Sequence, residues 1–164
     1  MLADTQKKFS WFQVPEDVKQ LLLLAAENWG NPLESEIYIN QALEKTENNI
    51  DVLISIYRYF YYKSNNPMAL QTISKVLDVI KKTEDFPDDW EKQKLILESR
   101  RNERKIRVYL SSLAAYGLVS AKLGNIEEAK TIFARVKQLD ENDEFSSGVL
   151  LDIVTRPHDE DEDY

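Results

Sequence analysis

The stretch from Leu110 to Asp143 constrains the fold most, because it has the pattern of two amphipathic helices separated by a glycine. Gly124 stands where the first helix would end in the left-handed conformation that glycine adopts without a steric penalty. Asn125 follows as the expected cap of the second helix, and Glu128 comes three residues later, as in a capping box. Apolar residues then recur at helical spacing, which gives the second helix one face to lay on the first.

Gly117 lies inside the first of these two helices rather than at an end. A glycine in a helix interior costs about 1 kcal/mol relative to alanine. We therefore expect the partner helix to approach closely at this point, where no Cβ stands in the way. In the second helix, small Ala129 and large Phe133 are four residues apart, and we expect them to pack as a pair.

The same pattern occurs earlier in the chain. Gly30 aligns with Gly124, and Ala69 aligns with Ala129, when the sequence is divided into frames of equal length. Repetition of one helical hairpin favours a helical repeat protein over an isolated hairpin. The frames define three helix pairs and one insert, the pairs at residues 16–49, 50–83 and 110–143 and the insert at residues 84–109.

These positions resemble those of the tetratricopeptide repeat family, whose 34-residue unit has large, Leu-Gly, Tyr, Ala, Phe and Pro positions at fixed spacings. The last unit supplies Leu113, Tyr116, Gly117, Gly124, Ala129 and Phe133 at the corresponding positions. It departs at Ser120, where the family has Tyr, and at Glu141, where it has Pro. The resemblance implies an all-α, right-handed α-solenoid of three helix pairs with a concave groove.

In this family the first helix of each pair lines the groove, and the groove binds a peptide or helix of a partner protein. The resemblance therefore assigns groove positions to Gln20, Leu24, Glu27, Asp51, Ile54, Arg58, Tyr61 and Leu118. We expect apolar members to anchor the partner and Arg58, beside Tyr61, to pair with a carboxylate. Tyr57 and Phe60 are expected to serve the core instead.

The insert opens with the helix-breaking sequence EDFPDD, in which Asp88 or Asp89 is expected to cap a helix near Trp90. From Trp90 to Leu123 there is no proline, and Gly117 is the one glycine. The sequence therefore predicts a single extended helix that runs from the insert into the third pair.

A basic run lies within this predicted helix and consists of Arg100, Arg101, Arg104, Lys105 and Arg107, with Glu103 among them. One interpretation is an exposed helix face supported by pairs of opposite charge one turn apart. The other is an anion patch for RNA, for a membrane surface or for the acidic tail of the chain itself.

The two ends of the chain differ from the repeats. Residues 1–15 form an aromatic arm, and we expect Trp11 and Phe12 to fold over the first helix pair, with a dimer contact as the alternative. Residues 144–154 are predicted to be a helix that caps the array. Residues 155–164 are an acidic tail expected to be disordered.

Composition disfavours catalysis. The chain has no cysteine, which excludes disulfides and thiolate metal sites, and its one histidine is His158 in the acidic tail. Its four glycines are isolated and form no phosphate loop. The net charge is −8, of which five acidic residues lie at 159–163, so the remainder is only mildly acidic. We therefore expect no enzyme activity, no cofactor, no metal and no nucleic-acid surface spread over the whole protein.

The longest strongly apolar run, Leu21 to Ala26, is far shorter than the roughly 20 residues needed to span a bilayer. No signal peptide is recognisable, so a cytoplasmic protein without a membrane span is expected. The sequence predicts a non-enzymatic adaptor or chaperone-like scaffold for protein–protein interaction, with one domain over residues 16–154. The alternatives are a nucleic-acid-associated factor that uses residues 100–107 and a domain that mainly self-associates, as in a homodimer.

Overall fold

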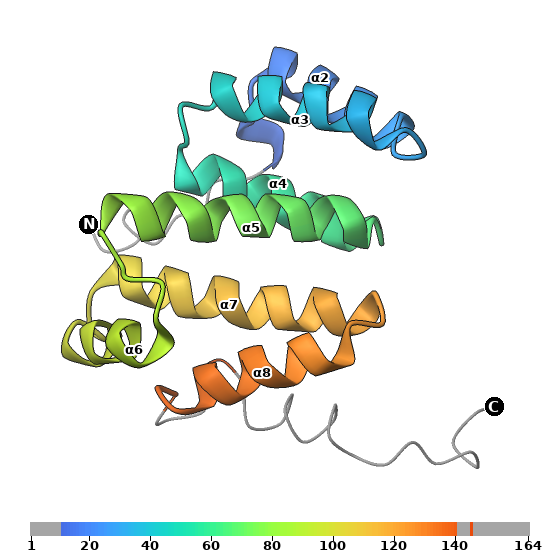
Figure 1. The fold of residues 1–164 in the computed structure, drawn as a ribbon. Coiled ribbons are helices and arrows are strands. Elements are labelled where there is room, and N and C mark those ends of the chain that lie inside the picture. The colour runs from blue at the N-terminus through green and yellow to red at the C-terminus, as the bar shows by residue number, and fades with distance from the viewer. Residues whose placement is uncertain (1–10, 141–144, 146–164) are drawn as a thin grey trace, which may run out of the picture. The chain divides into compact units, whose positions relative to one another are not determined.

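The structure is a computed structural model that describes residues 11–140 and residue 145 (Figure 1). All regular secondary structure in these residues is helical, which confirms the predicted all-α class. The elements are η1 (Trp11–Gln13), α2 (Glu16–Glu27), α3 (Pro32–Lys45), α4 (Ile50–Tyr62), α5 (Asn66–Thr83), α6 (Trp90–Ser99), α7 (Arg104–Lys122) and α8 (Ile126–Lys137). No described helix is long and apolar enough to cross a membrane.

The chain divides into two compact units, Met1–Val79 and Ile80–Tyr164, and the division falls inside α5. Two consecutive helices occur at each predicted pair position, namely α2 and α3, α4 and α5, and α7 and α8, and the α2–α3 and α7–α8 helices pack on each other. The stacking of these pairs into one solenoid, and the single domain over residues 16–154, stay predictions.

The starts of the two helices in the α2–α3 hairpin agree with the sequence pattern in their first turns, but the predicted side-chain cap by Asn31 does not form. Two acidic residues occupy the first turn of α2, and Pro32 occupies the first turn of α3 after Asn31. The Ser35 hydroxyl donates to the Ala25 carbonyl at 2.9 Å and ties the two helices together. The buried faces that meet consist of Val18, Leu22, Ala25, Ile39, Ala42 and Leu43.

The sequence pattern also predicts that the first helix ends at Gly30 and that Trp29 and Ile37 lie on the apolar faces of their helices, and the structure differs in all three. Helix α2 ends at Glu27 and not at Gly30, and the side-chain amide of the following Asn28 donates to a carbonyl of the last turn. Trp29, placed on the buried side by the pattern, lies in the turn and is 37% exposed. Ile37 is 54% exposed, because it lies about 200° around α3 from buried Ile39.

The aromatic arm does not pack as predicted. Trp11 stacks on Tyr59 of α4, with ring centroids 3.9 Å apart, and therefore lies on the second helix pair. Phe12 is 88% exposed, and Lys19 of α2 lies over its ring and over that of Trp11.

Side chains of asparagine cap both helices of the second pair. The Asn49 carboxamide accepts from the backbone N–H groups of Asp51 and Val52, and that of Asn65 accepts from Met68. The residues aligned with Ala129 and Phe133 of the third pair are Ala69 and Ile73, and both are buried, as the repeat frame predicts.

The predicted single helix from Trp90 to Leu123 is wrong. Helix α6 ends at Ser99, residues 100–103 form a turn, and α7 begins at Arg104. The Arg100 side chain explains the break, because it bonds to Glu103 across the turn and to Glu84 beyond the end of α5. The predicted cap before Trp90 is confirmed, since the Asp89 carboxylate accepts from the Lys92 N–H at 3.2 Å.

The α7–α8 turn confirms one predicted cap and contradicts another. Gly124 has a φ of +90°, and the N–H of Asn125 bonds to the Ser120 carbonyl at 2.8 Å, which is the hydrogen bond of a Schellman motif. The predicted capping box does not form, because Asn125 makes no side-chain capping bond. Glu128 instead accepts from the Tyr116 hydroxyl at 3.1 Å. The predicted capping helix at 144–154 and the acidic tail lie outside the described residues, apart from Phe145.

Candidate functional site

Three predicted groove residues lie on the exposed side of α2. Gln20, Leu24 and Glu27 are all exposed, opposite the buried face of the same helix. The Gln20 amide donates to Glu16 at 3.0 Å, so it is held along the helix. Leu24 is 38% exposed, and its neighbour Leu23, which the sequence reasoning did not select, is exposed to the same extent.

Four further groove residues form one stripe on α4. Asp51, Ile54, Arg58 and Tyr61 follow at spacings of three, four and three residues, and all are half-buried. The opposite face of α4 is buried and includes Phe60, as predicted. The stripe therefore offers an acid, an aliphatic side chain, a cation and a phenol along one partly exposed surface, which we call the α4 stripe.

Arg58 is the cation of the α4 stripe. Within the described part of the chain, no carboxylate pairs with its guanidinium. The Tyr61 ring packs edge-on against Tyr62, with centroids 6.2 Å apart, and Tyr62 is 82% exposed. Tyr57 is half-buried rather than fully in the core. Tyr59, which was also expected to pack, is the residue on which Trp11 stacks.

Leu118, the last predicted groove residue, belongs to α7 in the second unit and is half-buried. The other seven belong to α2 and α4 in the first unit. The structure thus assigns each groove residue to a helix surface, while a groove formed by both units stays a prediction.

A shallow hollow between α2 and α3 was not predicted. It has a volume of about 370 Å³ and is lined by Leu21, Gln41, Glu44 and Lys45. Lys45 also bonds to Asp17 at 3.2 Å, which lowers the pKa of the Asp17 carboxyl. Helical spacing had assigned Leu21 to the buried side of α2, and only the packing of two helices shows that it is half-exposed.

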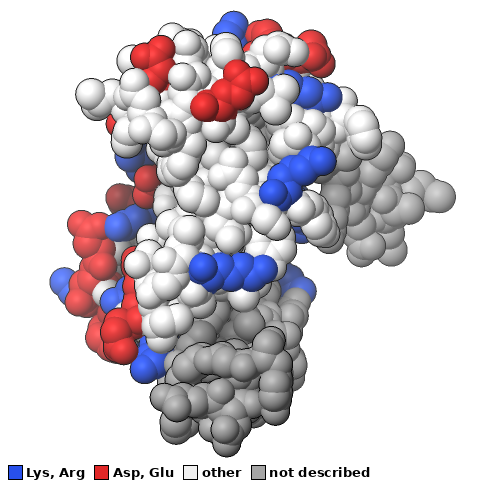
Figure 2. All heavy atoms as spheres, turned by 90° about the vertical axis from the view of Figure 1, so that its right-hand side faces the viewer, with Lys and Arg blue, Asp and Glu red and all other residues white. Residues whose placement is uncertain are grey.

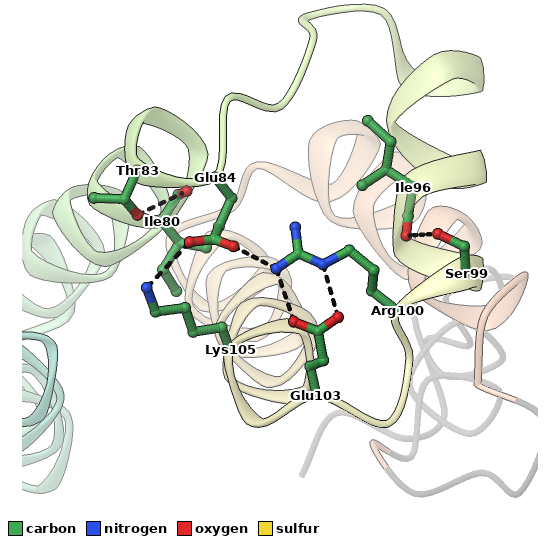
Figure 3. Close-up of polar contacts among 8 residues, drawn as sticks. All are labelled: Ile80, Thr83, Glu84, Ile96, Ser99, Arg100, Glu103 and Lys105. Carbon is green, nitrogen blue, oxygen red and sulfur yellow. Dashed lines mark hydrogen bonds and ion pairs between the residues drawn. The ribbon is translucent and has the colours of Figure 1, made fainter.

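Two members of the basic run, Arg100 and Lys105, lie at the α6–α7 turn and point toward Glu84 (Figure 3). Arg100 donates two hydrogen bonds to Glu103, at 2.8 and 2.9 Å, and also pairs with Glu84. Lys105 reaches the other oxygen of Glu84 at 3.1 Å. The Glu84 side chain is only 13% exposed. Through its bonds to Arg100 and Lys105, this one carboxylate links the end of α5 to the α6–α7 turn and to the start of α7.

These contacts shift the ionisation of both acids. Hydrogen bonds from Arg100 and then Lys105 hold the pKa of Glu84 below its usual value. The hydrogen bonds from Arg100 likewise lower the pKa of Glu103, while both acids raise the pKa of Arg100. Two of the five predicted anion-binding cations are therefore engaged by carboxylates of the chain.

The other three members of the basic run differ in exposure. Arg101 is half-buried, Arg104 and Arg107 are exposed, and all three make further contacts. On the face drawn in Figure 2, lysine and arginine side chains lie singly or in small groups, some among uncharged atoms and others beside aspartate and glutamate. Among the described residues, no cluster of three His, Cys, Asp or Glu side chains is arranged to hold a metal ion.

Comparison with known proteins finds one distant likeness and no family. No family model matches the sequence, and no solved structure matches it significantly. A curated protein, the uncharacterized 19.8 kDa protein in the nifW 5′ region of Azotobacter chroococcum mcd 1, is 27% identical over 109 residues. The match covers 65% of this chain and 61% of that protein, so the chain spans less than two thirds of the relative's length.

Proposed function

We propose that the protein is a non-enzymatic interaction module of the tetratricopeptide type that binds a peptide or helix of a partner protein. The α4 stripe is the proposed centre of the binding surface, and the exposed face of α2 extends it. The proposal is supported by the half-burial of all four stripe residues and by the exposed leucines of α2. A partly exposed surface that combines apolar and charged side chains can bind a peptide through apolar contacts and one ion pair.

Arg58 is the observation that carries the proposal. Arg58 is half-buried as a residue, and a charge-assisted hydrogen bond from a guanidinium to a carboxylate is stronger beside a partly covered surface than in open water. Since no carboxylate of the described residues pairs with Arg58, a partner's carboxylate is the group that fits there. Ile54 and Tyr61 lie one turn before and after Arg58 and would contact apolar groups on either side of that acid.

The preferred ligand is therefore a short segment with one Asp or Glu flanked by apolar side chains. A charge-assisted hydrogen bond contributes about 1.5–3 kcal/mol, which corresponds to about tenfold to a hundredfold in affinity. Binding through residues 100–107 to nucleic acid is less favoured, because Glu84 and Glu103 already engage Arg100 and Lys105.

The test is selection of peptides from a random displayed library against the whole protein. We expect the selected peptides to share an acidic residue between apolar ones, and Arg58→Gln to weaken them at least tenfold. The matched control is Lys75→Gln, which removes a half-buried cation from α5 in the same unit and should leave affinity unchanged. Equal affinity for the wild type and Arg58→Gln would contradict the proposed site, and selection of no peptide would contradict the function.

A further inference from the structure

Helix α3 exposes two aliphatic side chains on the side opposite its buried residues. Leu33 is 77% exposed and Ile37 is 54% exposed, and they stand one helical turn apart. At 100° per residue, Ile37 lies about 180° around the helix from the centre of the buried face. The packing of α3 on α2 therefore leaves this pair of side chains uncovered (Figure 1).

The same side of α3 continues toward its C-terminal end with polar side chains that border the hollow described above. Gln41 and Glu44 are exposed, and both line that hollow of about 370 Å³ together with Leu21 of α2. This volume is several times the roughly 30 Å³ of one water molecule, so the hollow admits a long side chain. We call this side of the helix the α3 face, and it consists of Leu33, Ile37, Gln41 and Glu44.

The α2–α3 hairpin contains far more acid than base. Residues 16–47 include seven acidic residues and two lysines, which is a formal charge of −5. Both lysines already have partners in the same unit. Lys45 pairs with Asp17 at 3.2 Å, and Lys19 lies over two aromatic rings at the start of the described chain. The hairpin thus presents a negative surface to anything that approaches it.

Three glutamates lie on or beside the α3 face. Glu34 and Glu36 stand about 80° to either side of the two aliphatic side chains, and Glu44 is on the face itself. The Glu34 carboxylate accepts from a tyrosine hydroxyl at 3.3 Å, which leaves its charge in place. Within the described part of the chain, the carboxylates of Glu36 and Glu44 make no ion pair or hydrogen bond. The exposed aliphatic pair is therefore bordered by negative charge that no cation offsets.

This combination of apolar and acidic side chains decides which kind of partner fits the α3 face. Nucleic acid and an anionic lipid surface both bring negative charge, and so does the same face of a second copy of the chain. Like charges brought together at an interface oppose binding. A basic amphipathic helix instead supplies apolar side chains and cations from one surface.

We propose that the α3 face binds a basic amphipathic helix of another protein. Two apolar side chains of that helix, one turn apart, contact Leu33 and Ile37. A Lys or Arg about two turns further along pairs with Glu44, because Ile37 and Glu44 are about 10 Å apart along α3. The aliphatic stem of this Lys or Arg lies in the hollow against Leu21. The contact is independent of the α4 stripe, whose proposed ligand is acidic.

The test is a selection against the whole protein from a displayed library of helical peptides of about five turns, randomised on one face. We expect the selected peptides to combine Lys or Arg with two apolar residues one turn apart. Leu33→Ala with Ile37→Ala should weaken their binding at least tenfold, and Glu44→Gln about threefold. All three side chains are exposed, so these variants should keep the helical content of the wild type, which circular dichroism checks.

Two controls and a salt series separate this site from general attraction to an acidic protein. Leu95→Ala removes a leucine that is 67% exposed, and Glu98→Gln removes an exposed carboxylate, both from α6 in the second unit. Neither should change the affinity. Affinity should fall as the Debye length shrinks from about 10 Å at 0.1 M salt to about 3 Å at 1 M, and less steeply in Glu44→Gln. Peptides of the α4 stripe are acidic, so the two proposals succeed or fail separately.

Three results would overturn the proposal. The first is a selection that yields no basic amphipathic peptide, and the second is equal affinity for the wild type and the Leu33→Ala, Ile37→Ala variant. The third is a different occupant. Sedimentation that shows a wild-type dimer lost in that variant would assign the face to a second copy. Binding to phosphatidylserine vesicles lost in the same variant would assign it to a membrane.

Discussion

Gly117 of α7 lies directly beneath the ring of Phe133 of α8: a Cβ built on Gly117 would stand 2.6 Å from Cε1 of that ring. Real Cβ contacts are never this short, so the absence of a side chain lets the two helices approach. Phe133 is fully buried, and since interior side chains are close-packed, a shift of its ring disturbs the residues around it. This contact with Phe133 explains why a glycine, which weakens a helix, stands in the interior of α7.

Gly117→Ala is therefore expected to destabilise the protein. Overpacking of a filled core costs about 1–3 kcal/mol, and alanine returns about 1 kcal/mol of helix propensity, so the net loss should be about 1 kcal/mol. Urea unfolding followed by circular dichroism measures it. Gly30→Ala is the control, because nothing lies within 4 Å of its added Cβ, and it should change stability little. A stabilised Gly117→Ala variant would contradict the close contact.

Local signals predicted several of the helix boundaries. Pro32 in the first turn of α3, Asp89 before α6 and Gly124 after α7 act through the backbone within a few residues, and all three occur as expected. The break at residues 100–103 has no such signal. It depends on Arg100 meeting Glu84, 16 residues away, and a sequence without proline or glycine at that point gives no warning of it.

In the candidate site too, some features could be predicted from local sequence and others depend on contacts between helices. The resemblance to the repeat family assigned Asp51, Ile54, Arg58 and Tyr61 to one surface, and at 100° per residue their spacing puts them on one side of α4. The hollow beside Gln41 and the stacking of Trp11 on Tyr59 depend on which helices meet, and no residue spacing encodes that.

The ion pairs of Glu84 make the stability of the second unit depend on pH. Its folded pKa is lowered by Arg100 and Lys105, so its ionised form is stabilised in the folded state. Its contribution is fully present above the unfolded value of about 4.3 and is lost as the pH falls through the folded value. Urea unfolding of the wild type and Glu84→Gln between pH 7 and pH 3 should show two stability curves that converge at low pH.

The control for this experiment is Glu98→Gln, which neutralises an exposed carboxylate on α6. Its curve should follow that of the wild type at every pH. If Glu84→Gln were as stable as the wild type at pH 7, the ion pairs of Glu84 would contribute nothing to the fold.

Ser112 and Ser120 are fully buried in α7, and their hydroxyls have no hydrogen-bond partner among the described residues. A buried hydroxyl without a partner costs about 1–3 kcal/mol, and alanine also favours the helix. We expect Ser112→Ala and Ser120→Ala each to raise the unfolding free energy by about 1 kcal/mol.

Ser35→Ala provides the opposite control for these two variants. Ser35 is equally buried, but its hydroxyl donates to the Ala25 carbonyl, so its loss should lower stability by about 1 kcal/mol. Equal destabilisation by all three substitutions would mean that the α7 hydroxyls are hydrogen-bonded after all.

A buried chain of hydrogen bonds secures α6 against α7. The Tyr109 hydroxyl donates to Oε1 of Gln93 at 2.9 Å, and Nε2 of Gln93 donates to the Pro87 carbonyl at 3.0 Å. Tyr109 is also packed edge-on against Phe86. Both members of the first bond are at most 6% exposed, so water cannot replace the donor that Tyr109→Phe removes.

Tyr109→Phe should therefore lower the unfolding free energy by about 1–2 kcal/mol, because it leaves a buried amide oxygen without a donor. Tyr38→Phe is the matched control, since the Tyr38 hydroxyl bonds to Glu34 at 3.3 Å near solvent and its loss should have little effect. Amide hydrogen exchange adds a local readout: α6 should lose protection in Tyr109→Phe, whereas the α2–α3 hairpin should not. Equal loss of protection in both places would assign the destabilisation to the whole chain and contradict a specific attachment of α6 through Gln93.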